Sequence, residues 1–296
     1  MTLLALHANL PLNPKSQIGY HLSGKSEDRD DVRIFREHRL SRPWDEKRPP
    51  ALATEIQGEK MTLKNKVAIV TGAGRGIGKA IARAYANEGA SVVCAARSTT
   101  EIEAVAAEIG GKAITCDVGD PAQIQNLIDT VIAEYGRIDI LINNAGAVAR
   151  LPTHELAIED WDNVININLR GVFICCKFAL PHMLNQGSGC IINISSGAGV
   201  VGPPNRSAYA ASKHGVMGLT KTMAVEYLHK GIRVHVILPD ATVSQMRSEG
   251  FPQEDPDSLI QAEDIADAAV FLATQKATAH SLEIRVSQGL KTKYVK

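Results

Sequence analysis

The sequence predicts an α/β fold in which helices cover both faces of one doubly wound parallel sheet. From Lys66 onward, short apolar runs of strand length alternate with longer segments of helical periodicity. These runs are apolar at nearly every position, which is typical of strands buried on both faces. A glycine-rich turn joins the first run to the first helical segment. Right-handed crossovers in such a sheet place ligands at the carboxyl ends of the strands.

The individual elements follow from these patterns. In chain order, the apolar runs predict strands over residues 67–70, 91–95, 113–115, 138–142, 191–194, 232–238 and 281–286. Helical periodicity predicts helices over residues 77–88, 121–135, 161–184 and 208–229. The alternation continues without a break, so we expect one domain over residues 61–296.

Residues 1–60 differ in composition from that domain. They combine prolines with mixed charge and show no periodic apolar pattern, which predicts a disordered N-terminal extension. A signal peptide is not expected, because no basic start precedes a long apolar core. As an alternative, Met61 opens a segment that leads directly into the first strand, and the preceding residues are then an upstream extension of the reading frame.

Bulk composition narrows the classes of function. The 32 basic and 32 acidic residues balance, so neither nucleic acid nor an anionic membrane is indicated as a partner. The longest apolar runs are of strand length, and no transmembrane helix is expected. The five cysteines form no CxxC pair and are expected to be buried, reduced thiols, which favours a cytoplasmic location. The nine histidines show no metal-ligand spacing, so no metal site is predicted.

The turn after the first strand reads Thr-Gly-Ala-Gly-Arg-Gly-Ile-Gly over residues 71–78. Glycines allow the backbone to turn tightly and to approach a pyrophosphate, and the amino end of the following helix offers free N–H groups and a positive dipole. The alternative is an ordinary tight turn. The candidate dinucleotide contacts in this turn are Gly72, Arg75, Gly76, Ile77 and Gly78.

The end of the second strand indicates which dinucleotide is bound. Sites for NAD(H) usually place a carboxylate there to bind the ribose 2′-hydroxyl. This strand ends without an acid and is followed by Arg97, which can hold a 2′-phosphate, and Arg75 is expected to face the same phosphate. Alternatively, either arginine is a solvated surface charge. The pattern favours NADP(H), with NAD(H) as the second choice.

Two further strand ends carry candidate cofactor contacts. Asp117, followed by Val118, either accepts a hydrogen bond from the adenine amino group or caps the helix that begins near residue 121. After the fourth strand, Asn144 can tie neighbouring strand ends together, while Ala145 and Gly146 leave room for a ring. The alternative for this second segment is an ordinary turn.

Tyr209 and Lys213 form the candidate proton-transfer pair. Four residues apart on a predicted helix, they lie one turn apart on the same face. A nearby ammonium favours the phenolate and moves the tyrosine pKa toward the range useful for acid and base catalysis. Ser196 follows the fifth strand and can donate a hydrogen bond to a carbonyl oxygen beside the tyrosine. The alternatives are an amphipathic helix with one Tyr and one Lys, and a serine that caps a helix or turn.

In this order and spacing, the TGxxxGxG turn, Asn-Asn-Ala-Gly at 143–146, the serine and the YxxxK pair resemble the short-chain dehydrogenase/reductase family over about residues 63–286. The resemblance implies a Rossmann-type fold. Among its members, the 3-oxoacyl-[acyl-carrier-protein] reductases are the most similar in general character.

The resemblance also implies roles for four residues. Tyr209 would be the general acid in reduction and the general base in oxidation. Lys213 would bind the nicotinamide ribose and lower the pKa of Tyr209, and Ser196 would orient the carbonyl. Asn168 matches the family's helix asparagine, which holds a water in the proton relay; its alternative is a buried asparagine that kinks a helix.

Three features depart from the family pattern. Asp240 follows Pro239 where the family has glycine, which puts the placement of the nicotinamide in question, and Ser244 takes the place of the family's threonine. The segment 246–261 is short for a lid over the substrate. The usual C-terminal Asp-Gly-Gly, often part of a tetramer interface, is missing after the last strand, so a homodimer through the long helices is expected as readily as a homotetramer.

The sequence therefore predicts an NADPH-preferring oxidoreductase that transfers hydride between nicotinamide and a small carbonyl compound or secondary alcohol. Two alternatives remain open at this point. One is an NAD-dependent alcohol dehydrogenase, and the other is a cofactor-binding protein of the same fold that has lost turnover.

Overall fold

The computed structural model describes residues 62–276 and 278–289, so the predicted N-terminal extension lies outside the described residues. Seven strands form one parallel sheet in the order β3-β2-β1-β4-β5-β6-β7. The strands are β1 Val67–Thr71, β2 Ser91–Ala96, β3 Lys112–Thr115, β4 Ile140–Asn143, β5 Gly189–Ile194, β6 Ile232–Pro239 and β7 Glu283–Val286. The predicted doubly wound parallel sheet is confirmed. Because the strand order reverses between β1 and β4, a ligand crevice is expected at their carboxyl ends.

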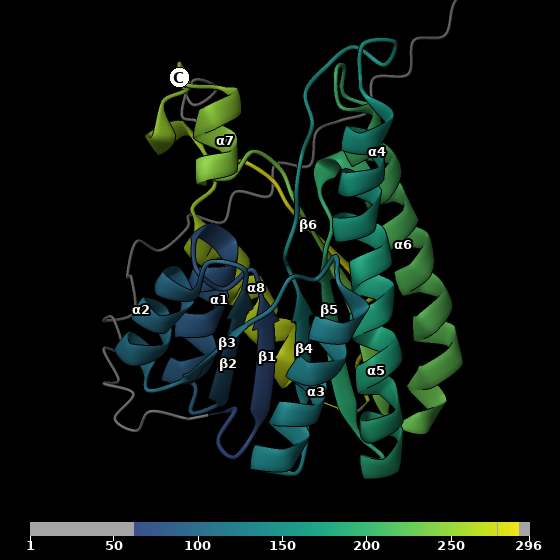
Figure 1. The fold of residues 1–296 in the computed structure, drawn as a ribbon. Helices are drawn as coiled ribbons and strands as arrows, with labels where there is room; N and C mark the ends of the chain where they lie inside the picture. Colours follow the sequence, from purple (N-terminus) through teal and green to yellow (C-terminus); the bar gives the residue numbers. More distant parts are fainter. Residues whose placement is uncertain (1–61, 277, 290–296) are drawn as a thin grey trace, which may run out of the picture. The chain divides into compact units, whose positions relative to one another are not determined.

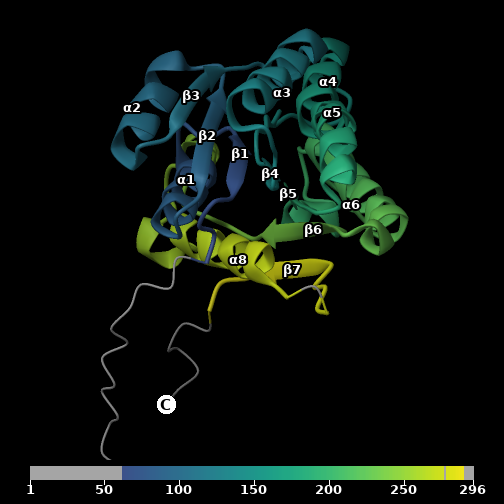
Figure 2. The ribbon, with the colours of Figure 1, turned by 90° about the horizontal axis from the view of Figure 1, so that it is seen from below.

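Helices cover both faces of the sheet (Figures 1 and 2). One layer contains α1 Gly76–Asn87, α2 Thr99–Ile109 and α8 Ala262–Thr274, and the other contains α3 Pro121–Tyr135, α4 Ile158–Ile165, α5 Gly171–Gln186 and α6 Ser207–Tyr227. Successive residues of a strand point to opposite layers: Ile69 packs on the α3, α5 and α6 side, whereas Ala68 and Val70 pack against α1 and α8. This two-sided burial explains why the strands are apolar at nearly every position.

The helix predicted over residues 161–184 is longer than expected and is interrupted. A π-helical segment, Asn166–Arg170, separates α4 from α5. Together the three segments make a helical stretch, Ile158–Gln186, that is long and apolar enough to span a membrane by length and composition alone. Its most apolar window is 56% buried within the protein, which is the pattern of a core helix. The apolar periodicity of the sequence did not reveal the π turn. In such a turn the backbone hydrogen bonds span five residues instead of four, and the α-helix continues on both sides of it.

Strand boundaries also differ from the prediction, three of them by two residues. The fourth strand begins at Ile140 instead of residue 138, the fifth at Gly189 instead of residue 191, and the last at Glu283 instead of residue 281. Ile138 donates its backbone N–H to the side chain of Gln186 at 3.0 Å, and is therefore held by a loop contact outside the ladder. Short apolar runs do not distinguish a strand from the buried residue that leads into it.

All five cysteines are buried free thiols, as predicted. Cys94 and Cys190 lie in strands, and Cys116 lies one residue beyond β3. Burial raises the pKa of each of these three thiols to about 11, which keeps them protonated at neutral pH.

His235 on β6 is fully buried at the edge where β6 meets β7. Its Nδ1 donates to the carbonyl oxygen of Ser281 at 2.8 Å, and its Nε2 has no hydrogen-bond partner among the described residues. Burial lowers the pKa of His235 to about 4, with the charges of Arg233 and His280 acting in the same direction and the Ser281 contact acting against them. The ring is therefore neutral in the folded protein at physiological pH.

We expect His235 to make the protein acid-sensitive. Since the unfolded ring takes up a proton near its ordinary pKa of about 6.5 and the folded ring only near 4, the unfolded state binds more protons between these values. Stability is therefore lost as the pH falls through this window, by about 2 kcal/mol between pH 7 and pH 5. In His235→Asn, whose amide can still donate to Ser281, this contribution should disappear.

Urea unfolding at pH 7 and pH 5 measures the effect. The difference in unfolding free energy between wild type and His235→Asn should shrink by about 2 kcal/mol at the lower pH. The exposed His229 gives a matched control, and His229→Asn should behave as wild type at both pH values. A difference that does not vary with pH would contradict the assignment.

Candidate active site

The predicted glycine turn connects β1 to α1 and is shaped to admit a ligand. Gly72 and Gly76 have φ angles of +65° and +51°, a region that side chains disfavour. A Cβ atom on Gly78 would clash with the carbonyl oxygen of Gly72, so the helix packs directly on the turn. Arg75 at the N-cap of α1 makes no capping bond with its side chain, and the first helical turn contains no acid. The amino end of α1 therefore offers free N–H groups, and these residues fit a dinucleotide pyrophosphate.

Asn144 braces this turn. Its Nδ2 donates to the carbonyl oxygens of Thr71 and Gly72 at 2.9 and 3.2 Å, which ties the end of β4 to the end of β1 as expected. The Thr71 hydroxyl in turn accepts the backbone N–H groups of Asn144 and Ala145 at 3.0 and 3.2 Å. The side chain of Asn144 is thus committed to the backbone of the turn, which it holds in shape beside the cavity.

At the end of β2, Arg97 is exposed and lines the same cavity as the glycine turn. Arg75, which we expected to face the same phosphate as Arg97, has its guanidinium 3.9 Å from the carboxylate of Glu101 and also contacts the side chain of Gln245. Glu101 sits in the first turn of α2, four residues after Arg97. A carboxylate in a following helix could not be placed beside Arg75 from the strand pattern alone.

For Asp117 the sequence left two roles open, a contact with adenine and a cap on the following helix, and the structure excludes the second. Asp120 caps α3 by accepting from the backbone of Ala122, so Asp117 is not the cap. Asp117 instead accepts the N–H of Gly119 at 2.8 Å and lines the cavity beside Val118 and Ile167. Its other carboxylate oxygen accepts no hydrogen bond from the described residues.

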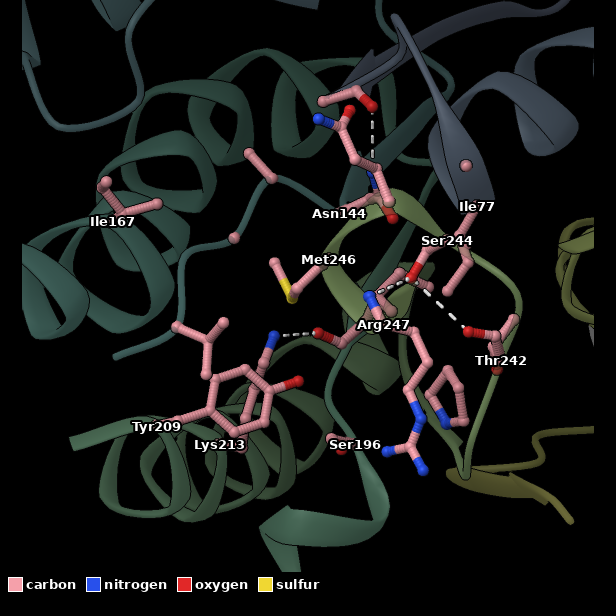
Figure 3. A pocket seen from close by; sticks show the side chains of 18 of the residues that line it. Ile77, Asn144, Ile167, Ser196, Tyr209, Lys213, Thr242, Ser244, Met246 and Arg247 are labelled. Atoms are coloured by element: carbon pink, nitrogen blue, oxygen red, sulfur yellow. Dashed lines mark hydrogen bonds between the residues drawn. The ribbon is translucent and has the colours of Figure 1, made fainter. Parts of the chain in front are cut away.

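Tyr209, Lys213 and Ser196 meet at one end of the same cavity, which has a volume of about 580 Å³. Figure 3 shows these three side chains together, with Asn144 and Ile77 on the opposite side of the view. Tyr209 and Lys213 lie one turn apart on α6, as predicted, and the Lys213 Nζ is 5.7 Å from the tyrosine ring centroid. That Nζ donates to the carbonyl oxygen of Ile194 at the end of β5, at 2.7 Å.

Ser196 has the capping role that the sequence left open as one of two alternatives. It is the N-cap of a 3-10 turn, Gly197–Gly199, and its Oγ accepts the N–H of Ala198 at 3.2 Å. Because the contact with Ala198 uses only an oxygen lone pair, the Ser196 hydroxyl can still act as a hydrogen-bond donor. The cap fixes the position of Oγ at the cavity wall.

The electrostatics of the pair differ from the sequence-based expectation. Burial raises the pKa of Tyr209, while a hydrogen bond with Ser196 and the charges of Arg206 and Arg150 act in the opposite direction. Burial lowers the pKa of Lys213 to about 8. At neutral pH Tyr209 is therefore a protonated phenol, the form that can donate a proton. The influence of the two arginines on Tyr209 was not foreseen, because both lie outside the YxxxK pattern.

Asn168 is fully buried and lies in the π-helical segment. Its Oδ1 accepts the N–H of Ala147 at 2.7 Å, and its Nδ2 donates to the carbonyl of Ala147 at 2.9 Å and to the Ser212 hydroxyl at 3.0 Å. Asn168 thereby joins the loop after β4 to α6, next to Lys213. Asn168 is thus a buried asparagine where a π turn interrupts the helix, and it also contacts α6 beside Lys213.

Asp240, in the position where the family pattern has glycine, forms an ion pair that sequence reasoning missed. Its Oδ1 and Oδ2 accept from the Arg285 guanidinium at 3.1 and 3.3 Å, and its carboxylate lies against Gly197, where a Cβ would clash with it. Arg285 on β7 thus compensates the added charge. Ser244 caps α7, Gln245–Gly250, by accepting the N–H of Arg247 at 3.2 Å.

Comparison with known proteins identifies relatives over the described domain. A family model for short chain dehydrogenase matches residues 66–255. The D-threitol dehydrogenase of Mycolicibacterium smegmatis is 40% identical over 229 residues, which are 73% of this chain and 88% of that protein.

Solved structures give the same result. The NADH complex of a 3-ketoacyl-(acyl-carrier-protein) reductase from Brucella melitensis is similar with a TM-score of 0.71 and 29% identity, over 76% of this chain and 97% of that one. A metagenomic short-chain oxidoreductase in complex with NADP has a TM-score of 0.68 and 36% identity, over 77% of this chain and 100% of that one. Both nicotinamide dinucleotides therefore occur among the similar structures.

Proposed function

The chain belongs to the short-chain dehydrogenase family, and we propose on that premise that it is an NADPH-preferring reductase of small carbonyl compounds, with Tyr209 as its proton donor. Membership makes it an oxidoreductase that uses a nicotinamide dinucleotide and acts on alcohol or carbonyl groups. The preference for NADPH, the proton donor and the roles of single residues are our proposals.

One observation carries this proposal: the side chains of Tyr209, Ser196 and Lys213 share a cavity with the glycine turn. The residues proposed to contact the dinucleotide are Gly72, Arg75, Gly76, Ile77, Gly78, Arg97, Asp117, Val118, Asn144, Ala145, Gly146, Tyr209 and Lys213. When bound, nicotinamide supplies the hydride in reduction and accepts it in oxidation.

The chain's own residues complete the reaction. In reduction, Ser196 donates a hydrogen bond to the substrate oxygen, and Tyr209 gives that oxygen its proton as the hydride reaches the carbon. Lys213 holds a positive charge beside the phenolate that forms, which stabilises it. Asn168 holds the loop at Ala147 and the hydroxyl of Ser212, and so positions α6 against the cavity. In oxidation each proton moves in the opposite direction.

The absence of an acid at the end of β2 supports the preference for NADPH, with Arg97 as the 2′-phosphate ligand. We expect Arg97→Asp to weaken NADPH binding about tenfold to hundredfold, because a charge-assisted bond worth about 1.5–3 kcal/mol is replaced by repulsion. Binding of NADH should change little or improve. Fluorescence titration of purified protein with each nucleotide measures both constants.

A charge reversal outside the cavity is the control for this titration. Lys177→Asp reverses an exposed charge on α5 outside the cavity and should leave both affinities unchanged. Equal or tighter binding of NADH by wild type would overturn the preference and favour alcohol oxidation with NAD. If neither nucleotide binds, the proposal as a whole is wrong.

We also propose a homo-oligomer, either a dimer or a tetramer, and a cytoplasmic location. Apolar side chains lie exposed on the long helices, among them Ile158 and Trp161 on α4, Phe173 on α5 and Val225 on α6. A second copy covering this face would remove them from water. Light scattering on the purified chain tests the assembly, and a monomer at all concentrations would contradict it.

A further inference from the structure

Three arginines from different parts of the chain converge on the ring of Phe251 near Tyr209. The Cζ atoms of Arg150, Arg206 and Arg247 lie 5.9, 5.2 and 3.9 Å from the ring centroid. All three line the cavity described above, and we call them the arginine cluster. Cation–π attraction accounts for each contact with the ring, but it does not remove the repulsion between three positive charges.

The fold brings this cluster to the proton-transfer end of the cavity. Arg150 lies in the loop after β4, and its neighbour Leu151 pairs with Arg206 in an isolated parallel bridge. Arg206 is the N-cap of α6, three residues before Tyr209. Arg247 lies on α7, and Figure 3 shows its side chain extending toward the end of the cavity that holds Tyr209 and Ser196.

Most acids near the cavity are already engaged elsewhere. Glu254 forms a two-pronged ion pair with Arg247, with one contact at 2.6 Å. Asp240 pairs with Arg285, and Glu101 faces Arg75 near the glycine turn. Within residues 62–276 and 278–289, no carboxylate lies within 4.0 Å of the guanidinium of Arg150 or Arg206. Two guanidinium groups near Tyr209 thus have no ion-pair partner among the described residues.

The contacts of these two arginines point to a missing partner. Arg150 donates from Nη2 to the carbonyl oxygen of Met246 at 2.6 Å, but its buried Nε has no hydrogen-bond partner among the described residues. The guanidinium of Arg150 packs directly against Gly250, so a Cβ atom at position 250 would clash with it. Burial lowers the pKa of Arg206, and the charges of Arg247 and Arg150 lower it further, while Tyr209 and the charge of Glu254 act in the opposite direction. A cluster with a purely structural role would be expected to carry its own counterions, because partly buried like charges repel.

We propose that the arginine cluster is the anion-binding part of the substrate site, and that this protein acts on carbonyl compounds or alcohols bearing a carboxylate or phosphate group. This inference rests on the proposed function, since it places the reacting carbon of such a substrate beside Tyr209. Guanidinium groups bind both anions in two-pronged fashion. The excess charge also raises the local concentration of anionic substrates in a cleft of low dielectric constant.

Calorimetric titration of the enzyme saturated with NADP⁺ tests the inference. Malonate serves as the carboxylate probe and inorganic phosphate as the phosphate probe, and saturation with NADP⁺ keeps both away from the cofactor's own phosphate contacts. We expect wild type to bind at least one probe. In Arg150→Gln and in Arg206→Gln, that binding should weaken by at least about tenfold, the equivalent of roughly 1.4 kcal/mol. The tighter of the two probes identifies the anionic group.

Two further variants make the experiment decisive. Arg83→Gln removes a half-buried arginine of α1 that pairs with Glu108 outside the cavity, and this variant should bind the probes as wild type does. Arg206→Lys keeps the charge without the planar fork and should lose less affinity than Arg206→Gln. Thermal melting verifies that each variant is folded.

The outcomes separate this inference from the function on which it rests. Normal binding of NADP⁺ without binding of either probe, or with equal binding in all variants, would overturn the anion site and leave the proposed reductase intact. Failure of NADP⁺ itself to bind would overturn both.

Discussion

Replacing Tyr209 by phenylalanine should reduce the rate constant kcat by about a thousandfold while the affinity for NADPH stays within about tenfold. The reason is that the variant keeps the ring, its burial and its place on α6, but loses the only atom proposed to carry the proton. Positioned proton transfer contributes about 10²–10⁴ in rate, and a dinucleotide held mainly by the glycine turn should be little affected. Steady-state kinetics and fluorescence titration of the same preparation measure the two quantities.

The helix itself supplies the control for this substitution. Tyr227 ends α6, packs partly buried against the core and lies outside the cavity. Tyr227→Phe removes the same hydroxyl from the same helix and should leave both kcat and NADPH affinity as in wild type. Turnover retained in Tyr209→Phe would eliminate Tyr209 as proton donor, whatever the affinity for the cofactor.

Asn168→Ala is expected to have the largest effect on stability. The substitution removes three hydrogen bonds and leaves the backbone N–H and carbonyl of Ala147 without the side chain that satisfies them. A buried polar group left without a partner costs about 1–3 kcal/mol, so we expect the free energy of unfolding to fall by about 3 kcal/mol. Denaturant unfolding at neutral pH measures this change.

The same substitution should also lower kcat, by about tenfold to hundredfold, because a small misplacement of reacting groups has a large effect on rate. Asn168 lies between the loop after β4 and α6, so its loss loosens two walls of the cavity at once. Asn163→Ala, an exposed change on α4, should alter stability by less than about 0.5 kcal/mol and leave kcat unchanged. If Asn168→Ala were as stable and active as this control, the bracing role would be wrong.

Much of the fold follows from local pattern. Strand-length apolar runs and helical periodicity placed the sheet and its main helices, because burial on both faces imposes that pattern on every parallel strand. The pattern gave element boundaries less well: it started the fourth strand at residue 138 and treated 161–184 as one helix. Both errors arise where a side-chain contact or a π turn, and not the periodicity, sets the boundary.

The sequence by itself determined the parts of the site that depend on short spacing. A glycine turn after a strand and two residues four apart on one helix have the same geometry in any packing, so the glycine turn and the Tyr209–Lys213 pair were predictable. Only the tertiary structure decided the charges around them. Arg285 meets Asp240 across 45 residues of chain, Glu101 comes to face Arg75, and the arginine cluster gathers from three separate loops and helices. Contacts of this kind depend on how loops pack at the sheet edge, for which no local periodicity exists.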